Sequence, residues 1–209
     1  LKKGTFFDMD FLFDEIPKKR VPFDFQSFTD TTKKFITSTV NCLTGEAVYY
    51  DEFEDAEHFF HICKAANSLP FIARITKING IPMLDGGMAD AIPIARALEE
   101  GWKKIVVVMT RNKDYRKKQR YLYLAFLQLI YHKYPKFVHM VTGRAKKYND
   151  SLDMLARLEQ EGKAFILRPA EHMNLKNKEA DAEKLREYYK HGYEVAEDRR
   201  KDLMEFLEK

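Results

Sequence analysis

The chain has 209 residues and a mass of 24.7 kDa; 45% of the residues are apolar and 33% are charged, which suits one large folded domain with a hydrophobic core. The two cysteines, Cys42 and Cys63, exclude a disulfide-rich mini-protein and fit a reducing compartment. A formal net charge of +4 is too balanced to indicate nucleic-acid binding, so we expect no nucleic-acid partner.

The first predicted elements are a hairpin and a helix. Residues 35–50 are rich in β-branched and aromatic residues on both sides of Thr44-Gly45, which predicts two strands joined by a turn. Residues 55–67 place apolar side chains at helical spacing, and Asp55 is well placed to cap the first turn of this helix.

A second hairpin follows. Residues 75–78 and 81–84 flank Asn79-Gly80, the favoured pair for a two-residue turn with positive φ angles. Pro82 has no N–H to donate, so we expect its strand to lie at a sheet edge or to be locally irregular.

The middle of the chain alternates helix, strand and helix. We expect a helix over residues 93–100 that stops at Gly101. The apolar run of residues 104–109 predicts a strand buried on both faces of a parallel sheet. A helix over residues 115–134, ended by Pro135, should follow.

The last third repeats this alternation. Residues 150–161 predict a helix with leucines on one stripe, and residues 164–167 predict a short buried strand closed by Pro169. Residues 178–207 predict two charged amphipathic helices that meet near Gly192. Strands that alternate with helices indicate an α/β fold with a largely parallel sheet flanked by helices.

The segment after the second hairpin has the pattern of a catalytic site. Asp85 ends a hydrophobic strand and is followed by Gly86 and Gly87, which allow backbone conformations closed to other residues. A carboxylate held at a strand end, beside closely approaching backbone, can accept a proton. The alternative is that Asp85 only starts a turn or caps the next helix.

This region resembles the patatin-like phospholipase family, in particular its bacterial branch. The similarity lies in the order of a helix ending in proline, a hairpin, Asp-Gly-Gly, a Pro-Ile pair, a glycine and a buried strand. The matching residues are Ala65–Phe71, Ile81–Gly87, Pro93-Ile94, Ala97, Gly101-Trp102 and Ile105–Val108. The strong resemblance covers roughly residues 35–110, and Asp90-Ala91 departs from the Asp-Asn of many relatives.

The resemblance implies a lipid acyl hydrolase that uses a Ser–Asp dyad and no cofactor. Asp85 would be the base that activates the serine, and Gly86 and Gly87 would shape the turn that holds it. It also implies a patatin-like single domain over residues 1–209, with residues 171–209 as a helical C-terminal extension. The expected substrate is a lipid or another acyl ester.

The serine half of the dyad has no counterpart here. In the family the nucleophile stands in a G-x-S-x-G turn, and none of the four serines has that context (Ser27, Ser38, Ser68 and Ser151). We therefore expect the C-terminal portion of a patatin-like protein, inactive alone, whose partner is a missing N-terminal segment with the first strand and the nucleophile. A non-catalytic relative that binds lipid or protein is the alternative.

A basic segment follows the predicted strand of residues 104–109. It contains Arg111, Lys113, Arg116 and Lys117. These residues could contact lipid head groups and hold the protein at the inner face of a membrane from the cytoplasm; a solvated helix start is the other interpretation. Residues 121–131 are apolar around most of a helix, which indicates either core packing or an acyl-binding groove.

Two further patterns suggest chemistry only weakly. Asp8 and Asp10 mimic the paired aspartates of Mg²⁺-dependent phosphatases, but Phe11 and Leu12 stand where that family has small residues and then Thr or Val. The six histidines and two cysteines form no pattern of metal ligands, so we expect no metal site.

Overall fold

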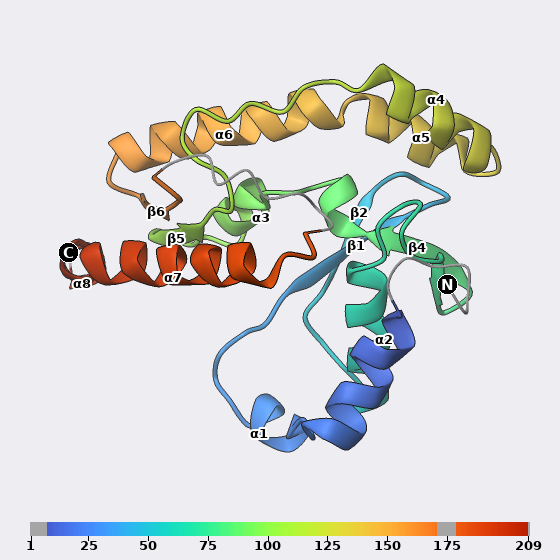
Figure 1. The fold of residues 1–209 in the computed structure, drawn as a ribbon, viewed down its shortest axis with the longest axis horizontal. Coiled ribbons are helices and arrows are strands. Elements are labelled where there is room, and N and C mark those ends of the chain that lie inside the picture. Colours follow the sequence, from blue (N-terminus) through green and yellow to red (C-terminus); the bar gives the residue numbers. More distant parts are fainter. Residues whose placement is uncertain (1–7, 171–178, 209) are drawn as a thin grey trace. The chain divides into compact units, whose positions relative to one another are not determined.

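The computed structural model describes residues 8–170 and 179–208. They belong to two compact units, the first formed from Leu1–Ile92 and Lys118–Tyr148 and the second from Pro93–Lys117 and Asn149–Lys209. Both units contain helices and strands (Figure 1), so the α/β class is confirmed. The single domain expected over residues 1–209 stays a prediction.

The first unit contains a four-stranded antiparallel sheet. Its strands are β1 (Thr37–Asn41), β2 (Ala47–Tyr50), β3 (Thr76–Ile78) and β4 (Ile81–Asp85), in the order β2-β1-β4-β3. Both predicted hairpins are confirmed. Strands joined by such short turns can pair only antiparallel, so the expectation of a largely parallel sheet is wrong for this unit.

Two turns of this sheet need residues that tolerate positive φ. Asn79 and Gly80 have φ angles of 50° and 78°, as the Asn-Gly turn predicts. Gly45 has a φ of +76°, and a Cβ atom there would lie 2.7 Å from the carbonyl oxygen of Lys136. Gly45 is therefore required both by its conformation and by the close approach of helix α5 (Pro135–Thr142).

Of the two alternatives predicted for Pro82, the edge position is wrong. Its strand β4 lies inside the sheet, between β1 and β3, rather than at an edge. The Pro82 carbonyl accepts a hydrogen bond from the N–H of Cys42, one residue beyond the end of β1. The missing N–H of Pro82 therefore falls where the β1–β4 pairing stops, and an inner strand can hold the proline there.

Helix α2 (Ala56–Ala66) packs on the sheet of the first unit, and its predicted cap is confirmed. The carboxylate of Asp55 accepts a hydrogen bond from the N–H of His58 at 2.7 Å. Phe59 on the buried face of α2 is surrounded by aromatic rings, several from the segment before β1 that carries helices η1 (Phe11–Arg20) and α1 (Phe25–Thr29).

The helix expected over residues 115–134 is shorter and is followed by a second helix. Helix α4 covers Tyr121–Ile130 only. Before it, the backbone N–H and C=O of Lys117 bond to the side chain of Asn149, which keeps this part of the chain out of a helix. After it, Pro135 begins α5 rather than ending a helix, because proline fits the first helical position, where no N–H is needed.

The second unit contains the one parallel pair in the described part of the chain. Strands β5 (Ile105–Val108) and β6 (Ala164–Leu167) pair in parallel, and the chain between them contains α4, α5 and helix α6 (Arg144–Gln160). Burial on both faces is wrong for β5, because Val106 and Val108 are exposed. Helix α3 (Ile94–Glu99) precedes β5 and stops before Gly101, whose φ is +84°.

The C-terminal helices meet later than expected. Helix α7 (Ala182–Asp198) continues through Gly192, and α8 (Arg200–Glu208) begins after Arg199. A glycine in a helix interior costs about 1 kcal/mol relative to alanine, too little to break a helix of 17 residues. Residues 171–178 of the expected helical extension lie outside the described residues.

Among residues 8–170 and 179–208, no helix combines the length and the apolar character that crossing a bilayer requires.

Candidate functional site

Asp85 is the last residue of β4 in the first unit, where the strand passes into the 3-10 turn η2 (Gly86–Met88). Met83 and Leu84 before it are buried in the core of the sheet. The N–H of Asp85 donates to the carbonyl oxygen of Ser68 at 3.0 Å. The sheet and this hydrogen bond together fix the backbone from which the carboxylate projects.

One oxygen of the Asp85 carboxylate has a structural partner. Oδ1 accepts a hydrogen bond from the N–H of Gly87 at 2.7 Å. Asp85 therefore starts a turn, as the alternative to a catalytic role predicts. No described residue donates a hydrogen bond to Oδ2. The side chain therefore has a fixed orientation and one oxygen that can still accept a proton.

The pKa of Asp85 is raised above its ordinary value of 3.8. Burial is the largest cause, because it disfavours the charged carboxylate. The N–H of Gly87 and the positive charge of Arg144 lower the pKa and offset part of that effect. A carboxylate with a raised pKa accepts a proton more readily than an exposed aspartate does.

The two glycines after Asp85 occupy crowded positions. A Cβ atom on Gly86 would lie 2.5 Å from the carbonyl oxygen of Ser38 in β1. A Cβ atom on Gly87 would lie 3.1 Å from Oδ1 of Asp85 itself. The Asp-Gly-Gly pattern is thus explained by close approach to β1 and to the carboxylate.

Arg144 is a site residue that the sequence analysis missed. Its Nε and Nη2 atoms donate to the carbonyl oxygen of Gly87 at 3.0 and 2.9 Å. Arg144 also lines a hollow of about 380 Å³ together with Ala89, Met140 and Lys147. No motif marks this arginine, because it is 57 residues from Gly87 in the sequence.

Two polar residues of the neighbouring strands complete the surroundings of the turn. Thr39 stands directly opposite Asp85 in the β1–β4 pairing, and its fully buried hydroxyl has no hydrogen-bond partner among the described residues. Tyr49 of β2 donates its hydroxyl proton to Oδ2 of Asp90 at 2.6 Å. Asp90 therefore holds the end of the turn against β2.

The three serines of the first unit do not form a dyad with Asp85. Ser27 donates to the carboxylate of Asp24 at 2.6 Å, and the buried Ser68 donates to the carbonyl oxygen of Lys64 at 2.7 Å. Ser38 stands beside Gly86, one residue before Thr39, so its side chain lies on the face of the sheet opposite to that of Asp85. Ser151 lies in α6, in the second unit.

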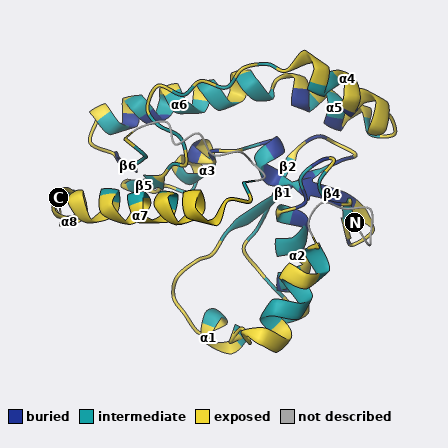
Figure 2. Cartoon of the chain, viewed as in Figure 1, coloured by how far each residue is buried: buried dark blue, intermediate teal, exposed yellow. Residues whose placement is uncertain are grey.

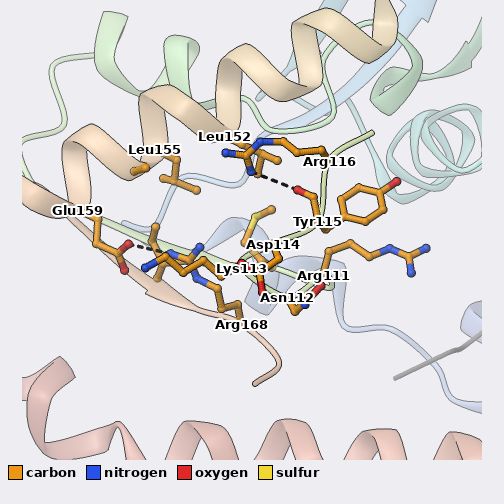
Figure 3. Close-up of a pocket in the computed structure, with 13 residues that line it drawn as sticks. Arg111, Asn112, Lys113, Asp114, Tyr115, Arg116, Leu152, Leu155, Glu159 and Arg168 are labelled. Carbon is orange, nitrogen blue, oxygen red and sulfur yellow. Dashed lines mark hydrogen bonds and ion pairs between the residues drawn. The ribbon is translucent and has the colours of Figure 1, made fainter. Parts of the chain in front are cut away.

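The predicted basic residues lie in the second unit. Arg111, Lys113 and Arg116 line a hollow beyond the carboxyl ends of β5 and β6, and Arg168, which the sequence analysis did not select, joins them (Figure 3). Lys117 does not line this hollow. The structure therefore brings together three of the four predicted residues.

The paired aspartates near the start of the chain have other partners. Asp8 accepts a hydrogen bond from the N–H of Phe11 at 3.0 Å, and Asp10 accepts one from the ammonium group of Lys64 at 2.6 Å. Lys64 also pairs with Asp14 at 3.2 Å. Lys64 therefore supplies a positive charge to Asp10, and no cluster of three or more metal-ligating side chains occurs among the described residues.

Comparison with known proteins adds one finding. Residues 134–208, about a third of the chain, match a domain of unknown function (DUF6363). This match begins after the Asp-Gly-Gly turn and includes Arg144 and Arg168. No match to a curated protein was found.

Proposed function

We propose that this chain supplies the aspartate of a patatin-like acyl hydrolase that acts through a Ser–Asp dyad. The observation that carries the proposal is the state of Asp85. Its carboxylate is half-buried at a strand end, its Oδ1 is held by Gly87, and no described residue donates to its Oδ2. A base that activates a serine needs such an oriented carboxylate with a raised pKa.

The order of elements supports the same family. Helix α2, the β3–β4 hairpin, the Asp-Gly-Gly turn, helix α3 after Pro93 and strand β5 follow one another as in the patatin-like pattern. The expected patatin-like sheet is largely parallel. The parallel pairing of β5 with β6 agrees with this expectation, and the antiparallel sheet of the first unit does not. Parallel sheets usually have both faces covered, so the exposed Val106 and Val108 leave one face of β5 without the cover that the expected sheet would have.

In the proposed reaction, the serine hydroxyl gives its proton to Oδ2 of Asp85 while its oxygen attacks the acyl carbonyl. The tetrahedral intermediate collapses, the alcohol leaves with a proton returned from Asp85, and an acyl-serine remains. Water then gives a proton to Asp85 as its oxygen attacks the acyl-serine, and Asp85 returns that proton to the serine oxygen as the fatty acid leaves. Because none of the four serines has the sequence context for this role, we propose that the nucleophile lies outside these 209 residues.

Helix α4 supports a lipid as the substrate. Its Tyr121, Leu122, Phe126, Leu129 and Ile130 are between 54 and 79% exposed, and Figure 2 shows much of α4 in the colour of exposed residues. Basic residues flank the helix on both sides: Lys118, Arg120, Lys133 and Lys136. An apolar helix face between positive charges fits the interface of an anionic membrane.

The first test is labelling by a fluorophosphonate, which modifies activated serines, followed by intact-mass measurement. The 209-residue chain should stay at 24.7 kDa, whereas the full protein that contains it should gain one label. Label on any of the four serines of this chain would contradict the proposal.

The second test is a matched pair of variants in the full protein. Asp85→Asn should lower kcat/KM for a fatty-acyl p-nitrophenyl ester by about 10²–10⁴-fold, the contribution of general acid–base catalysis. Asp90→Asn makes the same chemical change five residues later and keeps an acceptor for Tyr49, so it should lower kcat/KM less than tenfold. Equal activity of Asp85→Asn and the unmodified protein would refute the role of Asp85.

A non-catalytic lipid-binding protein is the second candidate, and the exposed face of α4 favours it. The two functions differ in fatty-acid release and in fluorophosphonate labelling. A binder would associate with phosphatidylglycerol vesicles through α4 and release no fatty acid from them, and the full protein would take no fluorophosphonate label.

A further inference from the structure

The second unit has a hollow of about 310 Å³ beyond the carboxyl ends of its two parallel strands. One wall is the segment from Arg111 to Arg116, which follows β5, and the opposite wall is helix α6 (Figure 3). Arg168, just after β6, forms part of the base. Ligands of α/β proteins commonly bind at this end of a parallel sheet.

Four cationic side chains line the hollow, and two of them are paired within the unit. Arg168 bonds to Glu159 at 2.8 Å, and Arg116 bonds to Asp153 at 3.1 Å. Arg111 lies over the ring of Tyr115, with its guanidinium carbon 5.2 Å from the ring centre.

The other two cations have no counter-ion in the described part of the chain. No carboxylate there pairs with Arg111 or Lys113. Asp114 and Glu159 are the two acidic residues of the lining, against four cations, so the hollow has an excess of positive charge. An excess of positive charge without partners favours an anionic ligand.

The backbone of this segment offers further donors. No described residue accepts a hydrogen bond from the N–H groups of Arg111, Asn112, Lys113 or Asp114. The side-chain amide of Asn112 likewise has no partner among the described residues. Consecutive free N–H groups beside cationic side chains are typical of sites for phosphoryl groups.

The opposite wall is apolar. Leu155 and Ile166 are buried beneath the hollow, and Leu152, Ala156 and Met109 extend this surface. The volume of about 310 Å³ exceeds what a phosphate ion alone fills and is typical of small-molecule sites. The ligand should therefore combine an anionic group with an organic part.

We propose that this hollow binds a phosphate monoester. Its phosphoryl group contacts Arg111, Lys113 and the N–H groups of the same segment, and its organic part lies against Leu152 and Leu155. A phosphate monoester carries up to two negative charges and three terminal oxygens, which match the two unpaired cations and the row of N–H donors better than a carboxylate does. The ligand is either a soluble ester or a lipid head group with the same chemistry. The proposal does not rest on the function proposed for Asp85.

The test measures the binding of glycerol 3-phosphate, and separately of vesicles with and without phosphatidic acid, by calorimetry and by sedimentation. The double variant Arg111→Gln/Lys113→Gln should weaken binding at least tenfold. The control Lys103→Gln/Arg186→Gln removes the same charge from exposed positions of the same unit, outside the hollow, and should change binding less than twofold.

Each outcome has a defined meaning. Binding of glycerol 3-phosphate that only the Arg111/Lys113 variant loses supports a soluble ester, and the same loss seen with phosphatidic acid vesicles alone supports a lipid head group. Absence of binding to both probes, or equal loss in the control variant, would overturn the proposal. Fluorophosphonate labelling of the full protein should be the same in both variants, so this test can fail independently of the Ser–Asp proposal.

Discussion

Gly86→Ala tests whether the close approach of the Asp85 turn to strand β1 stabilises the first unit. The new Cβ atom would lie 2.5 Å from the carbonyl oxygen of Ser38 and would also meet the Ser38 side chain. Real Cβ atoms essentially never come within 3.0 Å of other heavy atoms, so β1 or the turn has to move. The contact with the backbone oxygen is the decisive one, because no rotamer change can relieve it.

Overpacking of this kind costs about 1–3 kcal/mol of unfolding free energy. For a chain of 150–250 residues, each kcal/mol lowers Tm by about 2–4 °C, so Gly86→Ala should lower Tm by about 2–12 °C. The measurement is urea unfolding followed by circular dichroism, together with a thermal melt.

Gly143→Ala is the control. Gly143 has a φ of −85° and a ψ of −7°, and its added Cβ atom would lie 3.6 Å from the nearest atom, the carbonyl oxygen of Met140, an ordinary contact. The alanine should be neutral or stabilise by up to about 1 kcal/mol, because it restricts the unfolded chain.

A second variant separates the two contacts of the Gly86 Cβ atom. Ser38→Ala combined with Gly86→Ala removes the Ser38 hydroxyl but leaves its backbone oxygen, so only part of the lost stability should return. If Gly86→Ala unfolds at the same urea concentration as the unmodified chain, the argument from close approach is wrong.

Three further predictions follow from burial and capping. The pKa of Asp85 is raised, so the folded state binds the proton more tightly than the unfolded state, and the stability contribution of this group falls as pH rises above 3.8. At pH 7 Asp85→Asn should therefore unfold at a higher urea concentration than the unmodified chain, and at pH 3.5 this difference should be smaller. A difference that stays constant between the two pH values would contradict the raised pKa. Burial raises the pKa of Cys42 to about 12 and that of Cys63 to about 11. At pH 8 iodoacetamide should therefore modify neither thiol in the folded chain and both thiols in guanidinium, and rapid labelling of the folded chain would contradict this. Asp55→Ala should lower the unfolding free energy by about 1 kcal/mol and Asp55→Asn by only a few tenths, because asparagine still accepts a hydrogen bond from the His58 N–H.

The part of the site that comes from one continuous segment could be predicted. Asp85, Gly86 and Gly87 are predicted from their order and from the patatin-like resemblance, and the structure supplies a physical reason for each glycine. Arg144, Thr39 and Arg168 were missed because each reaches its site from a distant part of the chain. Nothing near them in the sequence marks a partner 46 to 57 residues away.

Local sequence determined the features whose energetics are local. The Asn79-Gly80 turn, the Asp55 cap and the end of helix α3 before Gly101 depend on backbone conformation and on hydrogen bonds within a few residues. Such signals need no knowledge of the rest of the fold.

Tertiary structure decided the sheet order and the helix boundaries. Strand β4 pairs with β1 and β3 and is an inner strand, which Pro82 permits because its missing N–H falls where the β1–β4 pairing stops. The helix expected over residues 115–134 begins only at Tyr121, because the side chain of Asn149 takes the backbone hydrogen bonds of Lys117 before it. Periodicity reports the preference of a segment, but a partner from elsewhere in the chain determines where its hydrogen bonds are made.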